Sequence, residues 1–462
     1  MNKTIVNNGL NCNKAKSKTT LFLKKVNIEP FMTMCKFKKI EGIPCIDVLK
    51  KCIELVFTNK SWNRTIKTEA VQDNVFQKDV IYRFLNSNKY LWESLLEVLS
   101  IQAINIINRL TSNKRIKALI FDDSFYDRSR SKKVELLSSV YDHTDGKYKK
   151  GFTLFTMGWS DSFSYIPIFF QLLASKESSR NYASKINEKE TDIQKKRRND
   201  ALKSKPEILI EMVKKSILCR IPFRYVLFDS WFAFPAIIAS VYNENKNVIT
   251  MLKRLKNIHY TYKGKSNNLM EIYKKIKSKL TKKCLRVSII VTMKDKERNK
   301  NIQVQIVFAR DEKSEKWVAL LSTNTKISAD EVIRIYGIRW NIEVFFKICK
   351  SYLKLAKEFM GRSFDMLIAH TTIVFLRYIM LSLSARENKD DKSIGDLFFA
   401  SCDEIKDISF FEAFEYLINF LISMIAKKMK KDVLQIEKMV ISFLHNLPLQ
   451  YQKYFMRKSC ET

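Results

Sequence analysis

Two short apolar segments that each run directly into an aspartate constrain the fold of this chain most strongly. Residues 118–121 (ALIF) lead into Asp122 and Asp123, and residues 225–228 (YVLF) lead into Asp229. Short apolar runs with polar ends are typical of buried strands in the middle of a sheet. Because ligands bind outside the carboxyl ends of such strands, the pattern predicts an α/β fold that presents carboxylates at one edge of its sheet.

A third carboxylate stands on a predicted helix that begins near Ser328. At 100° per residue, Tyr336, Arg339, Glu343 and Lys350 fall at about 0°, −60°, −20° and −40°, which makes one polar stripe on one helix. The opposite side is apolar and is predicted to face a core: Ile338, Ile342, Phe345 and Cys349. Taken alone, the stripe is also compatible with an ordinary solvated helix face.

The three carboxylates together favour a metal site over separate structural roles. Each aspartate could simply cap the turn that follows its strand. Two strand-end aspartates facing one helix glutamate, however, provide the oxygen ligands that Mg²⁺ or Mn²⁺ prefers. Two such ions about 4 Å apart can activate a nucleophile and stabilise the leaving oxygen of a phosphodiester.

Charge and cysteine usage narrow the class of partner. The net charge is +35, from 83 Lys and Arg against 48 Asp and Glu, which favours a polyanion such as nucleic acid or an anionic membrane surface. Because a chain rich in Lys, Ile and Asn can also reflect an AT-rich genome, the charge is supporting information only.

Nine scattered cysteines without a C-x-x-C pair argue against a zinc site or a disulfide framework, and a reducing cytoplasm is expected. The N-terminus has no apolar core of a signal peptide, and the long apolar stretch from Met366 contains His370 and Arg377, so a buried helix is expected rather than a membrane span.

The pattern of apolar residues divides the chain into regions of different character. Periodicity predicts helices before residue 110 and after residue 360, and mostly strands between Asp229 and the helix of Glu343. The expected organisation has five parts. A helical and possibly DNA-end-binding region at 1–110 comes first, followed by the first part of the core at 111–235 and a β-rich insertion at 236–325. The catalytic helix at 326–360 completes the core, and a helical region at 361–462 follows it.

The order Asp, Asp, Glu with a Y-x2-R-x3-E-x6-K run around the glutamate resembles the DDE transposases of the insertion sequence 4 family. The similarity covers roughly residues 117–386 and includes the stretches FDDS and LFDSWF. The resemblance implies a ribonuclease H-like core interrupted by a β-rich insertion between the second aspartate and the glutamate. The 114 residues from Asp229 to Glu343 leave room for such an insertion.

The resemblance also implies the roles of individual residues. Asp122, Asp229 and Glu343 would bind the catalytic Mg²⁺ or Mn²⁺, expected as two ions. Asp123 remains the alternative first carboxylate, although the family pattern of Asp, any residue, then Thr or Ser favours Asp122, which Ser124 follows at the right distance.

DNA contacts are expected from the same stripe and from one aromatic residue. Tyr336, Arg339 and Lys350 would contact phosphates of the transposon end, and Lys347, at about +20° on the helix, could add a contact or remain solvated. Trp317 could stack on a flipped base, although a Trp at the start of a strand is more often a core residue. Trp231 is expected to pack beneath the site.

The function implied by the resemblance is DNA transposition by an insertion sequence. Such an endonuclease nicks the element's ends and joins them to target DNA, so the expected partners are the terminal inverted repeats, target DNA and a second copy of the chain, with no membrane. Two alternatives remain open, which are a ribonuclease H-like nuclease without strand transfer and a non-catalytic DNA-binding protein from a domesticated or decayed element. The expected location is the bacterial cytoplasm, on the nucleoid when DNA is bound.

Overall fold

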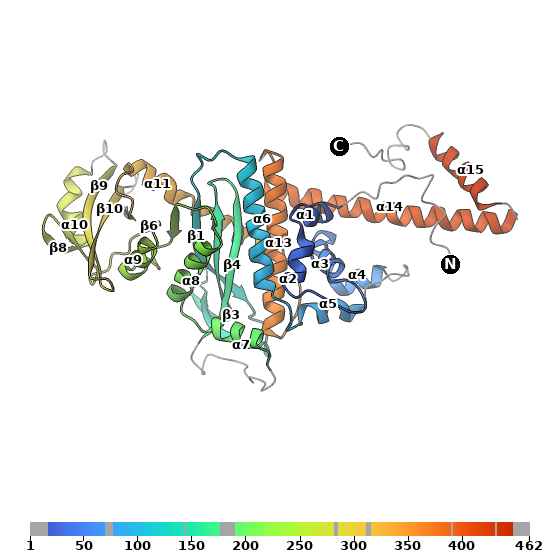
Figure 1. Cartoon of the computed structure of the whole chain (residues 1–462), viewed down its shortest axis with the longest axis horizontal. Coiled ribbons are helices and arrows are strands. Elements are labelled where there is room, and N and C mark those ends of the chain that lie inside the picture. Colours follow the sequence, from blue (N-terminus) through green and yellow to red (C-terminus); the bar gives the residue numbers. More distant parts are fainter. Residues whose placement is uncertain are drawn as a thin grey trace.

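The fold is a mixed α/β arrangement around one large sheet, which confirms the predicted class at that level (Figure 1). The computed structural model describes residues 17–69, 77–142, 145–175, 190–280, 285–310, 316–389, 391–429 and 432–446. The chain passes from an N-terminal group of helices into the sheet and returns to helices at its end.

The N-terminal region is helical, as its periodicity predicted. Its helices are α1 (Lys18–Lys25), α2 (Ile28–Met34), α3 (Cys45–Glu54), the 3₁₀ helix η1 (Leu55–Thr58), α4 (Trp62–Glu69), α5 (Lys78–Leu85) and α6 (Trp92–Leu110). Ser17 caps α1 by accepting a hydrogen bond from the backbone N–H of Thr20 at 3.2 Å. The ring of Trp92 on α6 packs edge to face against Phe84 on α5 and against Phe37, which follows α2.

The central strands combine antiparallel and parallel pairing. They are β1 (Ala118–Asp127), β2 (Ser138–Asp142), β3 (Lys147–Ser160), β4 (Tyr165–Leu173), β5 (Tyr225–Phe228) and β6 (Asn247–Met251). β4, β3 and β1 are neighbours and antiparallel, whereas β1, β5 and β6 are neighbours and parallel. The two strands that the sequence placed before aspartates, β1 and β5, are therefore adjacent and run in the same direction.

A second set of strands continues the same sheet. These strands are β7 (His259–Tyr262), β8 (Lys265–Asn268), β9 (Arg286–Asp295), β10 (Lys300–Arg310) and β11 (Trp317–Ser322). The short helices α10 (Leu269–Ile276) and η3 (Lys277–Lys279) lie between β8 and β9. β11 pairs antiparallel with β6, so the described strands form one eleven-stranded sheet. The strands predicted between Asp229 and Glu343 are thus present, and β6, within the range 236–325, pairs directly with β5.

Helices cover both faces of the central strands. They are α7 (Asp192–Ala201), α8 (Lys205–Leu218), α9 (Pro235–Asn243), α11 (Ala329–Gly337), α12 (Trp340–Ser351) and α13 (Phe364–Glu387). Tyr165 of β4 packs on Phe345 of α12, with ring centroids 5.0 Å apart. Gly158 of β3 allows this contact, because a Cβ there would stand 2.2 Å from the Tyr165 ring. Ser216 of α8 lies within 3.5 Å of the Met157 sulfur, on the other face of β3.

The long apolar segment near residue 366 is a buried helix, as predicted. α13 is long and apolar enough to cross a membrane by length and composition, but its apolar stretch is buried inside the protein. After α13 come α14 (Ile394–Met429) and α15 (Val433–His445), which confirms the helical character predicted for the C-terminal region.

Candidate active site

The two aspartates lie near each other, so that the charge of Asp229 acts on Asp122. Asp229 directly follows β5, as predicted, but the prediction that the first strand stops at Asp122 is wrong, because β1 continues to Asp127. Ile120 pairs with Leu227 in the parallel register, and Asp122 and Asp229 each come two residues later, just beyond the paired residues. The Asp122 carboxylate accepts a hydrogen bond from the backbone N–H of Asp123 at 2.8 Å. The Asp229 carboxylate accepts one from the backbone N–H of Trp231 at 2.9 Å.

Arg339 connects the first aspartate to the helix glutamate. Its Nη1 donates to Asp122 Oδ2 at 3.1 Å, and its Nη2 donates to the Glu343 carboxylate. All three side chains are largely shielded from solvent, with exposed fractions of 16% for Arg339, 18% for Asp122 and 33% for Glu343. Arg339 thus joins Asp122 to Glu343, and Asp229 lies close enough for its charge to act on Asp122.

The segment that carries the polar stripe is two helices, so the prediction of one continuous helix is wrong. α11 ends at Gly337 and α12 begins at Trp340. The N–H groups of Ile338, Arg339 and Ile342 bond to carbonyls three residues back, which tightens the turn where Gly337 weakens the helix. Ser328 caps α11 as predicted, by accepting from the N–H of Glu331 at 3.2 Å.

The apolar side of this segment faces the core, as predicted. Four side chains there are at most 9% exposed: Ile338, Ile342, Phe345 and Cys349. The Phe345 ring packs against the ring of Tyr165 on β4 and against that of Phe375 on α13. This packing fixes α12 beside β1 and so determines where Glu343 and Arg339 can reach.

Burial sets the electrostatics of the aspartates. Desolvation raises the pKa of Asp122 to about 7, although the adjacent N–H and Arg339 oppose the shift. Desolvation also raises the pKa of Asp229, with a further increase from the charge of Asp123. Crowded and buried carboxylates of this kind favour a bound proton or a nearby cation.

Asp123 has a different environment from Asp122. Because neighbouring residues of a strand point to opposite faces, Asp122 lies on the face of Thr156 and Asp123 on the face of Phe155. Asp123 forms an ion pair with Lys205, at the start of α8, at 3.0 Å. These contacts favour Asp122 as the partner of the Glu343 helix, although Asp123 remains close enough to influence the pKa of Asp229.

Trp231 does not pack beneath the site, so that prediction is wrong. Its side chain is 37% exposed, and its ring meets Phe232 edge to face at 4.7 Å. Lys205 Nζ lies 4.6 Å from the ring centroid. The core position next to Asp229 is taken by Phe232, which is fully buried, because the turn after β5 directs Trp231 outward.

The other predicted DNA-contact residues differ in how deeply they are buried. Tyr336 is partly buried beside Arg339, whose guanidinium carbon is 5.7 Å from the ring centroid, and burial raises the pKa of Tyr336. Lys350 lies at the far end of α12, where burial lowers its pKa and Asp142 and Asp127 partly oppose this. Lys347 is exposed on the surface of α12.

Trp317 occupies a core position rather than an open one. It is 8% exposed, and its ring stacks on Tyr273 with centroids 3.9 Å apart. The Arg254 guanidinium carbon lies 4.1 Å from the same ring. Stacking on a DNA base would require Trp317 to leave these partners, so the structure favours the packing alternative.

Two lysines near the aspartates were missed by the sequence reasoning. Lys205 contacts Asp123, as described above, and the charge of Lys253 acts on Asp229. Lys253 follows the buried strand β6, so it stands at the same sheet edge as the residues that follow β1 and β5. The same rule of strand ends that pointed to Asp122 and Asp229 could have identified Lys253.

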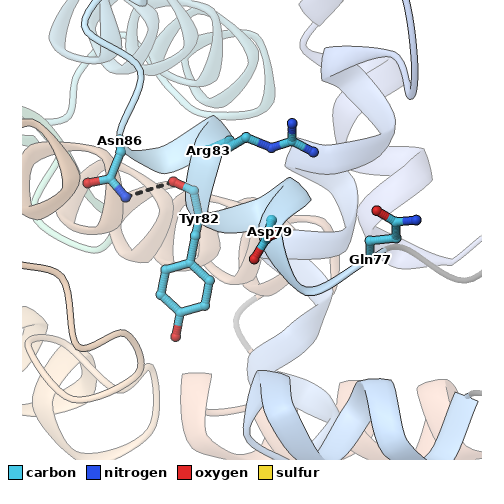
Figure 2. Close-up of a pocket in the computed structure, with 5 residues that line it drawn as sticks. All are labelled: Gln77, Asp79, Tyr82, Arg83 and Asn86. Carbon is cyan, nitrogen blue, oxygen red and sulfur yellow. Dashed lines mark hydrogen bonds between the residues drawn. The ribbon is translucent and has the colours of Figure 1, made fainter.

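A surface hollow lies elsewhere, on the N-terminal helices. It measures about 460 Å³ and is lined by Gln77, Asp79, Tyr82, Arg83 and Asn86 around α5. Figure 2 shows these side chains along one helix, with the Asn86 amide bonded to a backbone carbonyl. None of the predicted site residues lines this hollow.

Two family models match the chain over ranges that include the carboxylates. A model described as DDE superfamily endonuclease matches residues 67–268, and one described as Transposase DDE domain matches residues 193–380. The first range contains Asp122 and Asp229, and the second contains Asp229 and Glu343.

Comparison with whole proteins is less informative. No curated protein matches the chain. A solved structure described as a piggyBac transposase synaptic complex with hairpin DNA aligns with a TM-score of 0.43 and 11% identity, over 98% of this chain and 87% of that chain.

Proposed function

We infer that this chain is a DNA transposase of the DDE type, because both matching family models describe DDE nuclease or transposase domains. Together the models extend from residue 67 to residue 380, and this span contains all three candidate carboxylates. The observation that carries the mechanism is the convergence of Asp122 and Glu343 on one guanidinium, with Asp229 on the adjacent strand.

The finer assignment is a ribonuclease H-like core of the insertion sequence 4 type. Three antiparallel strands followed by two parallel ones, with the aspartates on the adjacent central pair, support such a core. The signature of Tyr336, Arg339, Glu343 and Lys350 supports the family assignment.

Asp122, Asp229 and Glu343 would hold two divalent ions, Mg²⁺ or Mn²⁺. The donor set fits hard cations, since the ligands are carboxylate oxygens and no described thiol or imidazole competes for the position. In the described residues, however, no group of three His, Cys, Asp or Glu side chains stands close enough to hold an ion as it lies. Arg339 bonds to two of the carboxylates, and its buried Nε lacks a hydrogen-bond partner there, which is compatible with a side chain that moves when a metal binds.

The bound ions would activate the attacking oxygen and stabilise the leaving one. The chain's own residues would position the DNA strand. Tyr336 at the end of α11, Arg339 just before α12 and Lys350 in the last turn of α12 would bind phosphates of the DNA strand. Lys205 and Lys253 add positive charge on the other side of Asp229.

The reaction needs no cleavable cofactor. Water first hydrolyses one phosphodiester at the element's end, and the freed 3′-hydroxyl then attacks a target phosphodiester. That second step forms one bond and breaks one, and the target's own 3′-oxygen leaves. The partners are therefore the terminal inverted repeats and target DNA, in a dimer that holds two ends, in the cytoplasm where the nucleoid is accessible.

Replacing Glu343 by Gln is expected to reduce Mg²⁺-dependent nicking by about 10³-fold, the effect of losing roughly 4 kcal/mol of transition-state stabilisation. The substrate is a labelled duplex that contains the DNA flanking the reading frame, and products are resolved on denaturing gels. Glu331→Gln is the matched control, because Glu331 lies on the preceding helix, where its side chain pairs with Arg334. Equal activity of wild type and Glu343→Gln would remove Glu343 from the mechanism.

The same experiment separates the alternative functions. A pre-cut end that is joined to target DNA supports transposition, whereas nicking without joined products supports a nuclease. DNA binding without any Mg²⁺-dependent cleavage supports a non-catalytic protein and contradicts the proposed reaction.

Replacing Arg339 by Met is expected to strengthen Mn²⁺ binding in the absence of DNA on the order of tenfold, which corresponds to about 1.4 kcal/mol. The guanidinium now neutralises Asp122 and Glu343, so it competes with a cation for the same oxygens. Mn²⁺ binding is measured by electron paramagnetic resonance of the free ion. DNA affinity should fall in parallel, with a shallower salt dependence.

Arg334→Met is the control, since Arg334 pairs with Glu331 on the surface of α11, away from the three carboxylates. A loss of Mn²⁺ binding in Arg339→Met would show that Arg339 supports the metal site instead of competing with it.

A further inference from the structure

Two buried hydroxyl groups stand close to Asp122 without a hydrogen-bond partner among the described residues. Thr156 on β3 is 0% exposed and Tyr165 on β4 is 2% exposed, and neither Thr156 Oγ1 nor the Tyr165 hydroxyl is bonded. Buried hydroxyls such as those of Ser100 and Thr250 instead donate to backbone carbonyls. Because a buried polar atom without a partner is destabilising, the two hydroxyls beside Asp122 require an explanation.

The strand register places Thr156 beside Asp122. The two residues are direct partners in the antiparallel pair of β1 and β3, so their side chains lie on the same face of the sheet. Side chains directly opposite each other in such a pair have Cβ atoms about 5 Å apart. The Thr156 hydroxyl is therefore a neighbour of the Asp122 carboxylate, on the face from which Arg339 reaches it.

Tyr165 reaches the same face from β4. Its hydroxyl lies over Gly158, where a Cβ would collide with the hydroxyl oxygen. Gly158 is two residues from Thr156 and pairs with Ile120, so it shares the face of Thr156 and Asp122. Burial raises the pKa of Tyr165, and the charges of neighbouring groups, including that of Asp122, add to this. The Tyr165 hydroxyl is thus a second polar group near this carboxylate.

The Asp122 carboxylate has other partners in the described structure. Oδ1 accepts a hydrogen bond from the backbone N–H of Asp123, and Oδ2 accepts one from Arg339 Nη1. When Arg339 leaves the carboxylate, as proposed above for metal binding, Oδ2 loses its side-chain donor. A hydroxyl proton rotates toward an available acceptor, so the two enclosed hydroxyls can then take over as donors.

We propose that Thr156 and Tyr165 are positioning residues, whose hydroxyls hold the Asp122 carboxylate in the orientation that binds a divalent ion. The inference rests on the proposed metal-dependent function and extends it to two residues that bind no metal themselves. Hydrogen bonds from surrounding groups orient ligating carboxylates, and losing such a bond weakens metal binding. Enclosing two unpartnered hydroxyls while Arg339 holds Asp122 is unfavourable, and this is offset when they bond to the carboxylate.

The packing of Tyr165 suits a positioning role. Its ring lies 5.0 Å from that of Phe345 on α12 and 6.2 Å from that of Tyr378 on α13, between centroids. Phe345 is two residues from Glu343, so the contact that fixes α12 also fixes the Tyr165 hydroxyl relative to this segment. Tyr165→Phe retains these ring contacts and removes only the hydroxyl.

The test is Mn²⁺ binding to the full chain without DNA, measured by electron paramagnetic resonance of the free ion. Thr156→Val and Tyr165→Phe, which keep the shape of the side chain, are each expected to weaken binding by about tenfold or more. Thr156→Ser retains a hydroxyl and is expected to bind close to wild type. Ser216→Ala is the control, because it removes a buried hydroxyl on the other face of β3, and it is expected to bind Mn²⁺ like wild type.

Thermal unfolding distinguishes positioning from packing. Because neither hydroxyl has a partner while Arg339 holds Asp122, Thr156→Val and Tyr165→Phe are expected to melt no lower than wild type without metal. The rise in melting temperature that Mn²⁺ causes in wild type should be smaller in both variants. A lower melting temperature without metal, together with weak Mn²⁺ binding by Thr156→Ser, would show a structural role and overturn the proposal.

Asp122→Asn separates this inference from the proposed function, because it is expected to abolish Mn²⁺ binding at the site. Binding that Asp122→Asn removes but that Thr156→Val and Tyr165→Phe retain at wild-type strength overturns only the roles of the two hydroxyls. Wild-type binding that Asp122→Asn leaves unchanged, or a wild type that binds no Mn²⁺, overturns the metal site itself and this inference with it.

Discussion

Asp122→Asn is expected to abolish metal-dependent DNA cleavage, with a loss of about 10³-fold or more, whereas Asp123→Asn is expected to retain activity within about tenfold. Asp122 lies on the side of β1 that faces α12 and shares Arg339 with Glu343. Asp123 points to the opposite side and pairs with Lys205. A metal held by the helix glutamate can therefore be shared with Asp122 without any change in the strand.

The measurement is single-turnover nicking of the flanking-DNA substrate in Mg²⁺, with both variants at equal concentration. Thermal unfolding of each variant is the control for folding. Asp123→Asn removes a partly exposed ion pair, so its effect on stability should stay below about 1 kcal/mol. The opposite order of activities would assign the first metal ligand to Asp123.

The second large effect is on stability and concerns Arg377 in the middle of α13. Arg377 is fully buried and donates to backbone carbonyls of Cys52 and Ile53 at the end of α3 and of Leu353 after α12. It also forms an ion pair with the buried Glu358 at 2.8 Å. One side chain therefore joins the N-terminal helices to the segment that follows the Glu343 helix.

Arg377→Ala is expected to destabilise the protein by about 3–5 kcal/mol, because it leaves the Glu358 charge buried without a partner. The melting temperature should fall by roughly 5 °C or more, measured by differential scanning fluorimetry. The exposed Arg334→Ala is expected to change stability by no more than about 0.5 kcal/mol. Arg377→Met/Glu358→Leu should recover part of the loss, since no charge then remains buried.

The pH dependence of this contact follows from the same ion pair. Burial alone would raise the pKa of Glu358, but Arg377 and His370 outweigh it, so that its pKa is lowered. A carboxyl group with a lowered pKa stabilises the fold above its unfolded value and loses this contribution as pH falls through the folded pKa. Acid should therefore destabilise wild type more steeply than Arg377→Met/Glu358→Leu. Parallel acid profiles would contradict this account.

The local part of the site could be predicted from the sequence, because it depends on neighbours along the chain. Apolar runs that end in Asp122 and Asp229 become buried strands wherever a sheet forms, and the spacing of Ile342 and Phe345 determines which side of a helix enters a core. The helical termini and the strands between the second aspartate and Glu343 follow from the same periodicity.

Other features depended on which helices pack on which face of the sheet, and periodicity carries no information about that. The sequence predicted one helix here, but a turn separates α11 from α12. Arg339 lies in this turn, and its guanidinium reaches Asp122 and Glu343. Trp231 faces solvent because Phe232 fills the core beside it.

By itself, then, the sequence pointed to the three carboxylates and their order, and it predicted a strand at Asp122, a strand before Asp229 and a helix at Glu343. Only the tertiary structure decided between the environments of Asp122 and Asp123, because alternation along β1 assigns them to opposite faces and only α12 and α8 distinguish those faces. The tertiary structure also decided that one apolar side of α14 packs on α15 while another stays exposed. The physical reason is the same in both cases: local propensity sets the direction of a side chain relative to its own element, whereas burial depends on the element that packs against it.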